Sequence, residues 1–170
     1  QFQSIVLLAA LVSNSAHFMK IFTQVNALNQ FLTEYRNKHV DSSIGFVPTM
    51  GALHLGHVSL IESAAKKVDL IICSIFVNPT QFNSQKDLET YPRDVENDQI
   101  LLEKNGCDVL FLPTVEELYP KGQNEKYLID FQGIDEVMEG FYRPGHFLGV
   151  AMVVERFLRI VNPDFAFFGR

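Results

Sequence analysis

The segment DLIICSIFV, residues 69–77, is apolar at nearly every position and rich in β-branched side chains. A strand that faces water on one side alternates polar and apolar residues, whereas a strand covered on both faces is apolar throughout. The segment therefore predicts a central strand of a parallel sheet. Because parallel strands are joined by long crossovers, usually helices, this one run directs the chain towards an α/β fold.

Helix and strand patterns alternate around this run. Apolar residues recur at helical spacing behind Thr23, which predicts an amphipathic helix with Thr23 as its N-cap. The next expected elements are a strand at 43–48, a helix at 56–68, the strand at 69–77, a polar loop at 78–92, a helix at 95–104 and a strand at 108–113. After them come a helical turn at 115–120, a more exposed strand at 126–131, a long buried helix at 145–161 and a fourth buried strand at 163–169. This alternation predicts a doubly wound parallel α/β sheet.

The length and composition suit one compact domain, since 47% of the 170 residues are hydrophobic. Residues 1–18 stand apart because they contain no Asp, Glu, Lys or Arg. We interpret them as an N-terminal extension and expect the domain to occupy residues 19–170, starting at Met19. A secretion signal cleaved near Ala16 is the alternative, although the basic segment that begins such signals is missing.

Charge and cysteine content argue against several classes of protein. Acidic residues outnumber basic ones by 20 to 14, and no Lys/Arg stripe is present, so binding to nucleic acids or anionic membranes through bulk charge is not expected. Cys73 and Cys107 each lie in or beside an apolar run. We expect both to be reduced core residues, because a zinc site would need paired ligands at short spacing.

The loop after the strand at 43–48 carries the most specific pattern, FVPTMGALHLGH at 46–57. Ligands of open α/β sheets bind outside the carboxyl ends of the strands, and a helix start there attracts anions. Gly51 would allow a sharp turn and Gly56 a close approach of the backbone to a ligand. His54 and His57, three residues apart, can both reach one side of the helix start. The loop therefore predicts a phosphate site.

Other interpretations of the two histidines remain open. One histidine can cap the helix while the other packs beneath the loop. Zinc binding is a further option, but no third ligand is evident. The segment is not a P-loop, since no lysine follows the second glycine, nor is it a dinucleotide-binding fingerprint.

The motif HLGH resembles the H-x-G-H signature of the nucleotidyltransferase superfamily, whose histidines contact the triphosphate of ATP. Longer segments resemble the pantoate:β-alanine ligase family, in that family's order, from about Met19 to Gly169. They are VPTMGALHLGHVSLI, SIFVNPTQF, DLETYPRD, RPGHFLGV and NPDFAFFG. The resemblance implies a Rossmann-like sheet of the HUP or nucleotidyltransferase type in a cytoplasmic homodimer. It also implies that pantoate is condensed with β-alanine at the expense of ATP, with Mg²⁺.

The resemblance further implies roles for single residues. His57 would carry acid chemistry, with His54 beside it on the phosphates. Gln81 and Asn78 would contact pantoate or β-alanine, although Asn78 before Pro79 also suits a turn. The ATP site would comprise Met50, Gly51, Ala52, Leu53, His54, Leu55, Gly56 and His57.

Weaker candidates lie further along the chain. Arg143 would suit a carboxylate or phosphate and His146 would face the site, yet RPGH also suits a turn into the long helix. Four acidic residues are expected to form a solvated loop and helix face, and none is assigned as a magnesium ligand. They are Asp87, Glu89, Asp94 and Asp98.

The sequence departs from the family pattern at its end. Arg170 stands where the family has Glu, and the lysine and aspartate that follow there have no counterpart in this sequence. We therefore expect an incomplete nucleotide-binding domain without the C-terminal domain, with little or no catalysis and with the apolar FAFF segment partly exposed. Two alternatives stay open. One is another H-x-G-H nucleotidyltransferase acting on a phosphate-bearing substrate, and the other is a non-catalytic nucleotide-binding module.

Overall fold

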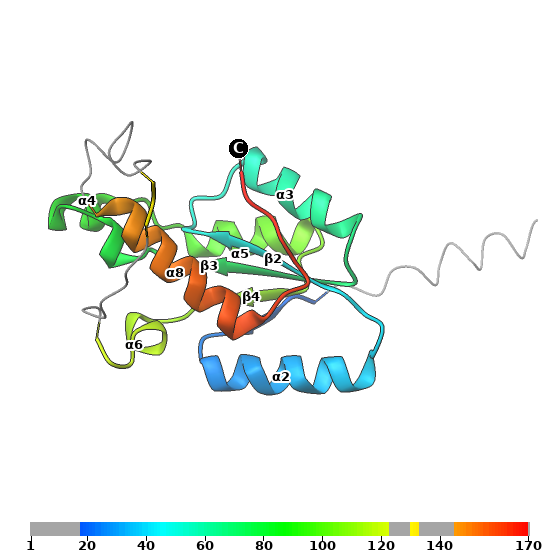
Figure 1. Ribbon diagram of the computed structural model, residues 1–170. Coiled ribbons are helices and arrows are strands. Elements are labelled where there is room, and N and C mark those ends of the chain that lie inside the picture. Colours follow the sequence, from blue (N-terminus) through cyan, green and yellow to red (C-terminus); the bar gives the residue numbers. More distant parts are fainter. Residues whose placement is uncertain (1–17, 123–129, 133–144, 170) are drawn as a thin grey trace, which may run out of the picture.

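The computed structural model describes residues 18–122, 130–132 and 145–169 (Figure 1). Three sequence predictions fall wholly or mostly outside these ranges: the N-terminal extension at 1–18, the strand at 126–131 and the candidate Arg143. They therefore stay predictions.

The described residues form one parallel sheet whose strands follow the order β1-β4-β3-β2-β5. The strands are β1 Lys20–Phe22, β2 Ile44–Thr49, β3 Leu70–Ile75, β4 Val109–Phe111 and β5 Phe165–Ala166. The predicted α/β class and the positions of the last four strands are confirmed. The sequence pattern missed β1, because its three residues are too few to show any periodicity. This strand forms one edge of the sheet by pairing Lys20 with Val109.

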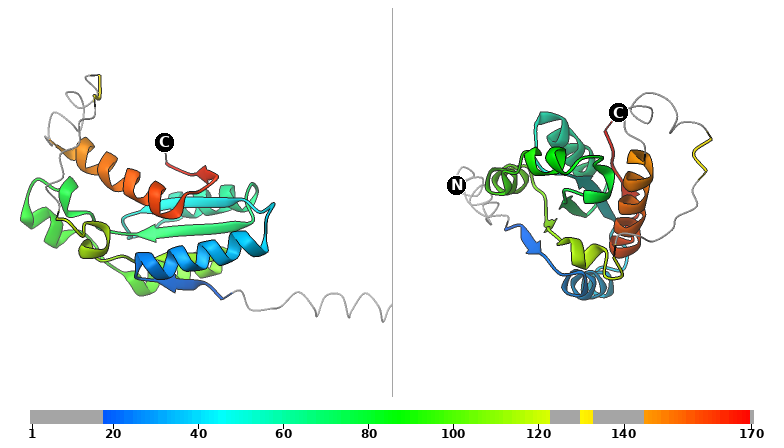
Figure 2. Two further views of the ribbon diagram at one scale, coloured as in Figure 1. Left: turned by 60° about the horizontal axis from the view of Figure 1, so that its bottom comes forward. Right: turned by 90° about the vertical axis from the view of Figure 1, so that its left-hand side faces the viewer.

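Helices cover both faces of the sheet (Figure 2). They are α2 Val25–Lys38, α3 Leu55–Ala65, α4 Gln85–Thr90, α5 Val95–Lys104, α6 Val115–Leu118 and α8 His146–Val161, with a 3-10 turn η1 at Pro79–Gln81. One core cluster joins α2 and α8 to the sheet, and a second joins α3 and α5 to the opposite face. The short elements η1 and α4 lie within 78–92, which the sequence predicted as a loop. No helix in the described ranges is both long and apolar enough to cross a membrane.

The strand β3 is covered on both faces, as its sequence predicted. Ile72 packs in one core cluster with Phe157 of α8, whereas Cys73, the next residue, packs on the opposite side with Leu102 of α5. The sequence was also right about the cysteines, since Cys73 and Cys107 are buried and no disulfide joins them. Burial raises the pKa of the Cys107 thiol to about 12.

The last strand, β5, is shorter and more open than predicted. It pairs with β2 through Phe165 opposite Gly45 and Ala166 opposite Phe46. The side chain of Phe165 is 47% exposed and that of Phe168 is 51% exposed. The prediction of a fourth buried strand is therefore wrong at these positions, whereas the expected partial exposure of the FAFF segment is confirmed.

Candidate active site

The loop after β2 lies at the carboxyl edge of the sheet, where the strand order reverses. The strands β3 and β4 lie on one side of β2, and β5 lies on the other. Ligands of open α/β sheets bind at such a reversal. The loop 50–54 leads from β2 into α3 at this edge (Figure 1). The predicted phosphate loop therefore occupies the place that the fold favours for a ligand.

Two consecutive left-handed residues turn this loop sharply. Gly51 has a φ of 82°, as the sequence predicted, and Ala52 has a φ of 51°. The left-handed conformation costs a residue with a side chain roughly 1–2 kcal/mol. Asp98 of α5 offsets this cost, because its carboxylate accepts hydrogen bonds from the N–H of Ala52 at 2.9 Å and of Leu53 at 2.7 Å. Hydrogen bonds to a charged acceptor are about twice as strong as neutral ones, so Asp98 holds the loop in place.

The prediction that Asp98 belongs to a solvated helix face is wrong. Its side chain is only 4% exposed, because α5 turns it towards the loop after β2, where two backbone N–H groups take the place of water. The other three acidic residues of that prediction, Asp87, Glu89 and Asp94, are exposed as expected. Asp94 caps α5 by accepting a hydrogen bond from the N–H of Asn97.

The two histidines of HLGH cap the start of α3 reciprocally. The N–H of Gly56 donates to Nδ1 of His54 at 3.0 Å, and the N–H of His54 donates to Nδ1 of His57 at 3.3 Å. Because an N–H group can only donate, both Nδ1 atoms must act as acceptors, and each neutral ring carries its hydrogen on Nε2. The capping alternative is therefore right for one histidine, but the second one also caps the helix, which that alternative did not expect. Capping does not exclude anion binding, since the caps engage Nδ1 and leave Nε2–H to donate beyond the helix.

The environment of His57 favours the neutral ring. Burial lowers its pKa, and the neighbouring His54 lowers it further, while the Asp98 carboxylate acts in the opposite direction. The two histidine rings lie with their centroids 4.2 Å apart. Gly56 makes this pairing possible, because a Cβ at that position would lie 2.8 Å from Cε1 of His54.

A cavity of about 410 Å³ opens beside this loop, between the carboxyl end of β2 and α8. Most of its described wall is apolar, and the polar side chains come from Thr49, His57, Gln81, Tyr91 and His146. The lining residues are Pro48, Thr49, Met50, His57, Phe76, Gln81, Tyr91, His146, Val150, Val153, Val154, Phe157 and Phe168. Such a chamber, with few polar groups on an apolar wall, is typical of a site for a small organic molecule.

Gln81 and Asn78 have different positions relative to this cavity. The side chain of Gln81 reaches the wall, where its Nε2 donates to Sδ of Met50 at 2.6 Å. Asn78 lies behind the wall and is fully buried. Its Nδ2 donates to the carbonyl of Gly149 at 3.0 Å, and its Oδ1 accepts from the hydroxyl of Tyr119 at 3.0 Å. Asn78 therefore ties η1 to α8, which fixes the position of Gln81.

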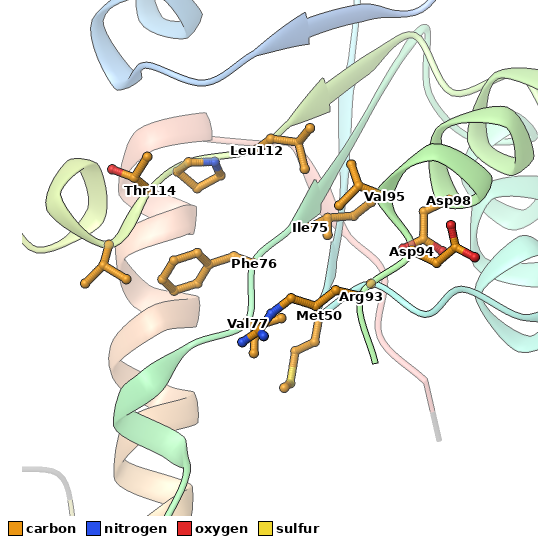
Figure 3. Close-up of a pocket in the computed structure, with 13 residues that line it drawn as sticks. Met50, Ile75, Phe76, Val77, Arg93, Asp94, Val95, Asp98, Leu112 and Thr114 are labelled. Atoms are coloured by element: carbon orange, nitrogen blue, oxygen red, sulfur yellow. The ribbon is translucent and has the colours of Figure 1, made fainter. Parts of the chain in front are cut away.

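Two further cavities adjoin the first at Met50. One, of about 380 Å³, also shares Gln81, Tyr91 and His146 with it and reaches Asp87. The other, of about 240 Å³, lies past the ends of β3 and β4, and its close-up shows Arg93 beside Met50 (Figure 3). Within the described part of the chain, these three neighbouring spaces thus lie at the end of β2.

The structure brings some predicted site residues together and separates others. Met50, His57 and Gln81 line the main cavity, while Ala52 directs its N–H group to Asp98. Leu55 is 83% exposed at the start of α3. Sequence reasoning missed the α8 residues that form the apolar wall, because their helical spacing is the same as that of any core-facing helix. It also missed Tyr91, whose pKa is raised by burial and by the Asp98 carboxylate.

Comparisons with known proteins agree with one another. The family model for pantoate-beta-alanine ligase matches residues 20–170. Curated relatives include a pantothenate synthetase of Porphyromonas gingivalis, 48% identical over 151 residues, which are 89% of this chain and 52% of the relative. Another is the pantoate--beta-alanine ligase of Dictyostelium discoideum, 46% identical over 140 residues, which cover 82% of this chain and 47% of the relative. The chain thus spans about half the length of the curated relatives it matches.

Solved structures show the same likeness. The crystal structure of pantoate-beta-alanine ligase from Francisella tularensis, complexed with beta-gamma ATP and beta-alanine, has a TM-score of 0.80 and 41% identity. It matches over 88% of this chain and 56% of its own. The pantothenate synthetase of Thermus thermophilus has a TM-score of 0.77 and 41% identity, over 87% of this chain and 51% of its own.

Proposed function

This chain belongs to the pantoate-beta-alanine ligase family, and from that premise we propose that it forms the part of the enzyme that binds ATP and pantoate. The proposed reaction has two steps. The pantoate carboxylate attacks the α-phosphorus of ATP, which yields pantoyl adenylate and pyrophosphate, and the amine of β-alanine then displaces AMP. Both steps depend on positioning and charge stabilisation rather than on a covalent nucleophile of the protein.

One observation carries this proposal. His57 belongs both to the capped start of α3 and to the wall of the 410 Å³ cavity. A phosphate at the helix start and a small acid in the cavity would therefore be neighbours, as the first step requires.

The proposed ATP site is the start of α3. This end of the helix attracts anions, and the Nε2–H groups of His54 and His57 would donate to the triphosphate. A phosphate anion beside His57 would favour its protonated form, which suits the acid role that we propose for it during departure of pyrophosphate. In that form Nδ1 also carries a hydrogen, so the hydrogen bond that it accepts from the N–H of His54 must open. The backbone that presents both rings is held by Asp98.

The proposed pantoate site is the cavity between β2 and α8. The methyl groups of pantoate would pack against Val150, Val153 and Val154, and the Gln81 amide would hydrogen-bond to its polar end. Gln81 is also the proposed polar contact for β-alanine. Asn78 contributes by holding η1 against α8 and so by keeping Gln81 at the wall.

Magnesium belongs to the proposal as a partner of the nucleotide. Among the described residues no three His, Cys, Asp or Glu side chains cluster as a metal site. Mg²⁺ often needs only one or two protein carboxylates, because substrate phosphates supply further oxygens. We therefore assign it to the phosphates, whose charge it would neutralise, and to no protein ligand. The homodimer and the cytoplasmic location implied by the resemblance are also proposals, and light scattering on the purified protein would measure the first.

The rival nucleotidyltransferase interpretation expects a phosphate-bearing acceptor in the same cavity. Its described lining contains no Lys or Arg, which a buried phosphate would be expected to contact. The apolar wall therefore favours pantoate. A non-catalytic nucleotide-binding module is the third interpretation, and it gives no reason for a separate acid-binding cavity.

Isothermal titration calorimetry on the purified chain tests the proposed function. We expect binding of ATP with Mg²⁺, binding of pantoate, and no binding of glycerol 3-phosphate. Gln81→Ala should weaken pantoate binding at least tenfold without changing ATP binding, whereas the matched variant Gln85→Ala, at an exposed position of α4, should change neither. Binding of glycerol 3-phosphate in preference to pantoate would refute the proposal.

A further inference from the structure

His146 is held in the opposite tautomer from the two histidines of HLGH. It is the first residue of α8, and its Nδ1 lies 2.9 Å from the carbonyl oxygen of Gln81. A carbonyl oxygen can only accept, so Nδ1 must carry the hydrogen. The neutral ring then has its lone pair on Nε2, whereas His54 and His57 have theirs on Nδ1. His146 is therefore oriented as a proton acceptor.

His146 lies where the 410 Å³ and the 380 Å³ cavities meet. Among the residues that the structure describes, four line both the 410 Å³ and the 380 Å³ cavity: Met50, Gln81, Tyr91 and His146. The amide and the thioether have no basicity near neutral pH, and the raised pKa of Tyr91 keeps its phenol protonated. Histidine is the side chain that exchanges protons in this range. Within the described lining, His146 is thus the base at the junction of the two cavities.

The two cavities differ in the charge that they present. The 410 Å³ cavity has no Asp, Glu, Lys or Arg in its described lining, whereas the 380 Å³ cavity has the exposed carboxylate of Asp87. A carboxylate attracts an ammonium group, and the apolar wall of the 410 Å³ cavity suits the activated acid. An amine bound in the 380 Å³ cavity would meet the acyl group beside His146.

We propose that His146 is the general base that takes a proton from the β-alanine nitrogen during formation of the amide. This inference rests on the proposed function. The ammonium group loses one proton to water and becomes a free amine. Its lone pair then forms the C–N bond with the pantoyl carbonyl carbon, and the carbonyl π electrons move to oxygen. Nε2 of His146 accepts one of the two hydrogens on that nitrogen as a proton. The carbonyl re-forms as the C–O bond to phosphate breaks, AMP leaves with the bonding pair, and His146 later returns the proton to water.

A purely structural role for His146 is the alternative, because its bond to Gln81 also tethers α8 to η1. The variant His146→Asn separates the two roles. An Asn side chain places an N–H donor close to where Nδ1 of histidine lies, so the tether to the Gln81 carbonyl can form, but Asn has no basic atom corresponding to Nε2.

The test supplies synthetic pantoyl adenylate to the purified chain and measures the product formed with β-alanine or with hydroxylamine. Hydroxylamine is weakly basic, so its nitrogen gives up the proton to water readily and needs no protein base. With β-alanine we expect His146→Asn to react at least 100-fold more slowly than the unaltered chain, within the range of about 10²–10⁴ for general base catalysis. With hydroxylamine the two proteins should react at similar rates, and the control His39→Asn, at an exposed position after α2, should match the unaltered chain with both nucleophiles.

The other outcomes overturn the proposal in distinguishable ways. If His146→Asn and the unaltered chain react with β-alanine at equal rates, His146 is not the general base, and the proposed function is unaffected. Equal slowing with both nucleophiles would show that His146 only maintains the cavity. If the unaltered chain accelerates neither reaction over the rate in buffer, the general base is refuted for this chain, whereas the proposed function, which concerns binding of ATP and pantoate, is decided by calorimetry.

Discussion

The loop of HLGH depends on a single buried carboxylate, and replacing Asp98 tests that dependence. The N–H groups of Ala52 and Leu53 both donate to this carboxylate, at 2.9 and 2.7 Å. In Asp98→Asn one oxygen becomes an NH₂ group, which is a donor and would point at an N–H donor of the loop. One hydrogen bond is lost, and one partly buried N–H group loses its acceptor.

The cost can be worked out from these contacts. A hydrogen bond to a charged group contributes about 1.5–3 kcal/mol, and an unsatisfied buried donor costs about 1–3 kcal/mol. Because the loop can relax when Ala52 leaves its left-handed conformation, we expect Asp98→Asn to lower the free energy of unfolding by about 2–3 kcal/mol. A loop that relaxes in this way no longer presents the two histidines together, so ATP binding should weaken as well.

Urea denaturation followed by circular dichroism measures the loss of stability, and calorimetry at a temperature where the variant is folded measures ATP binding. The matched control is Asp94→Asn, which changes an exposed carboxylate at the start of the same helix and keeps an N-cap acceptor. It should have a smaller effect on stability and none on ATP binding. If Asp98→Asn costs no more than Asp94→Asn and binds ATP normally, the account of this loop is wrong.

Three further predictions concern packing, protonation and reactivity. Gly149→Ala places a Cβ 2.5 Å from the carbonyl oxygen of Thr80, so α8 must move, and we expect a loss of at least about 2 kcal/mol in urea denaturation with weaker pantoate binding; unchanged stability would show that the close approach is unimportant. Because the pKa of His57 is lowered in the folded chain, the unfolded chain takes up this proton first, and stability should fall as the pH drops below about 6.5, the ordinary value for histidine. NMR titration of its Cε1–H and loss of that pH slope in His57→Gln check this, and a titration at or above the ordinary value contradicts it. Burial and raised pKa values should protect Cys73 and Cys107 from iodoacetamide at pH 8 in the native chain but not in urea, and modification of the folded protein at the unfolded rate would refute this.

The elements that the sequence predicted best are those with long or strongly patterned segments. The apolar run at 69–77 identified β3, and helical spacing identified α2 and α8. Short elements escaped prediction, because β1 has three residues and α4 has six, too few for a period to be distinguished from chance. The exposure of β5 was harder to predict, since burial depends on what packs against a strand.

Only part of the candidate site could be predicted, for a similar reason. The histidines of HLGH and Gln81 could be found because their residue types are unusual after a strand in an α/β fold. The role of Asp98 could not be predicted, because its partners are backbone N–H groups, which are not specific to any residue type. Exposed acidic residues also precede it on the chain. The turn role considered for Asn78 is present, because its Oδ1 accepts a hydrogen bond from the N–H of Thr80. Its bond to Gly149, 71 residues away, could not be predicted from the sequence.

The central claim is that a nucleotide site and an acid site meet at His57. A non-hydrolysable sulfamoyl analogue of pantoyl adenylate tests it most directly, since one molecule would occupy both sites and would require no catalysis. Calorimetry should show that the analogue binds the chain at least 100-fold more tightly than either AMP or pantoate, because joining two ligands removes much of the entropic cost of binding the second. Gln81→Ala should reduce this advantage. An affinity no higher than that of AMP alone would contradict the claim that the two sites adjoin.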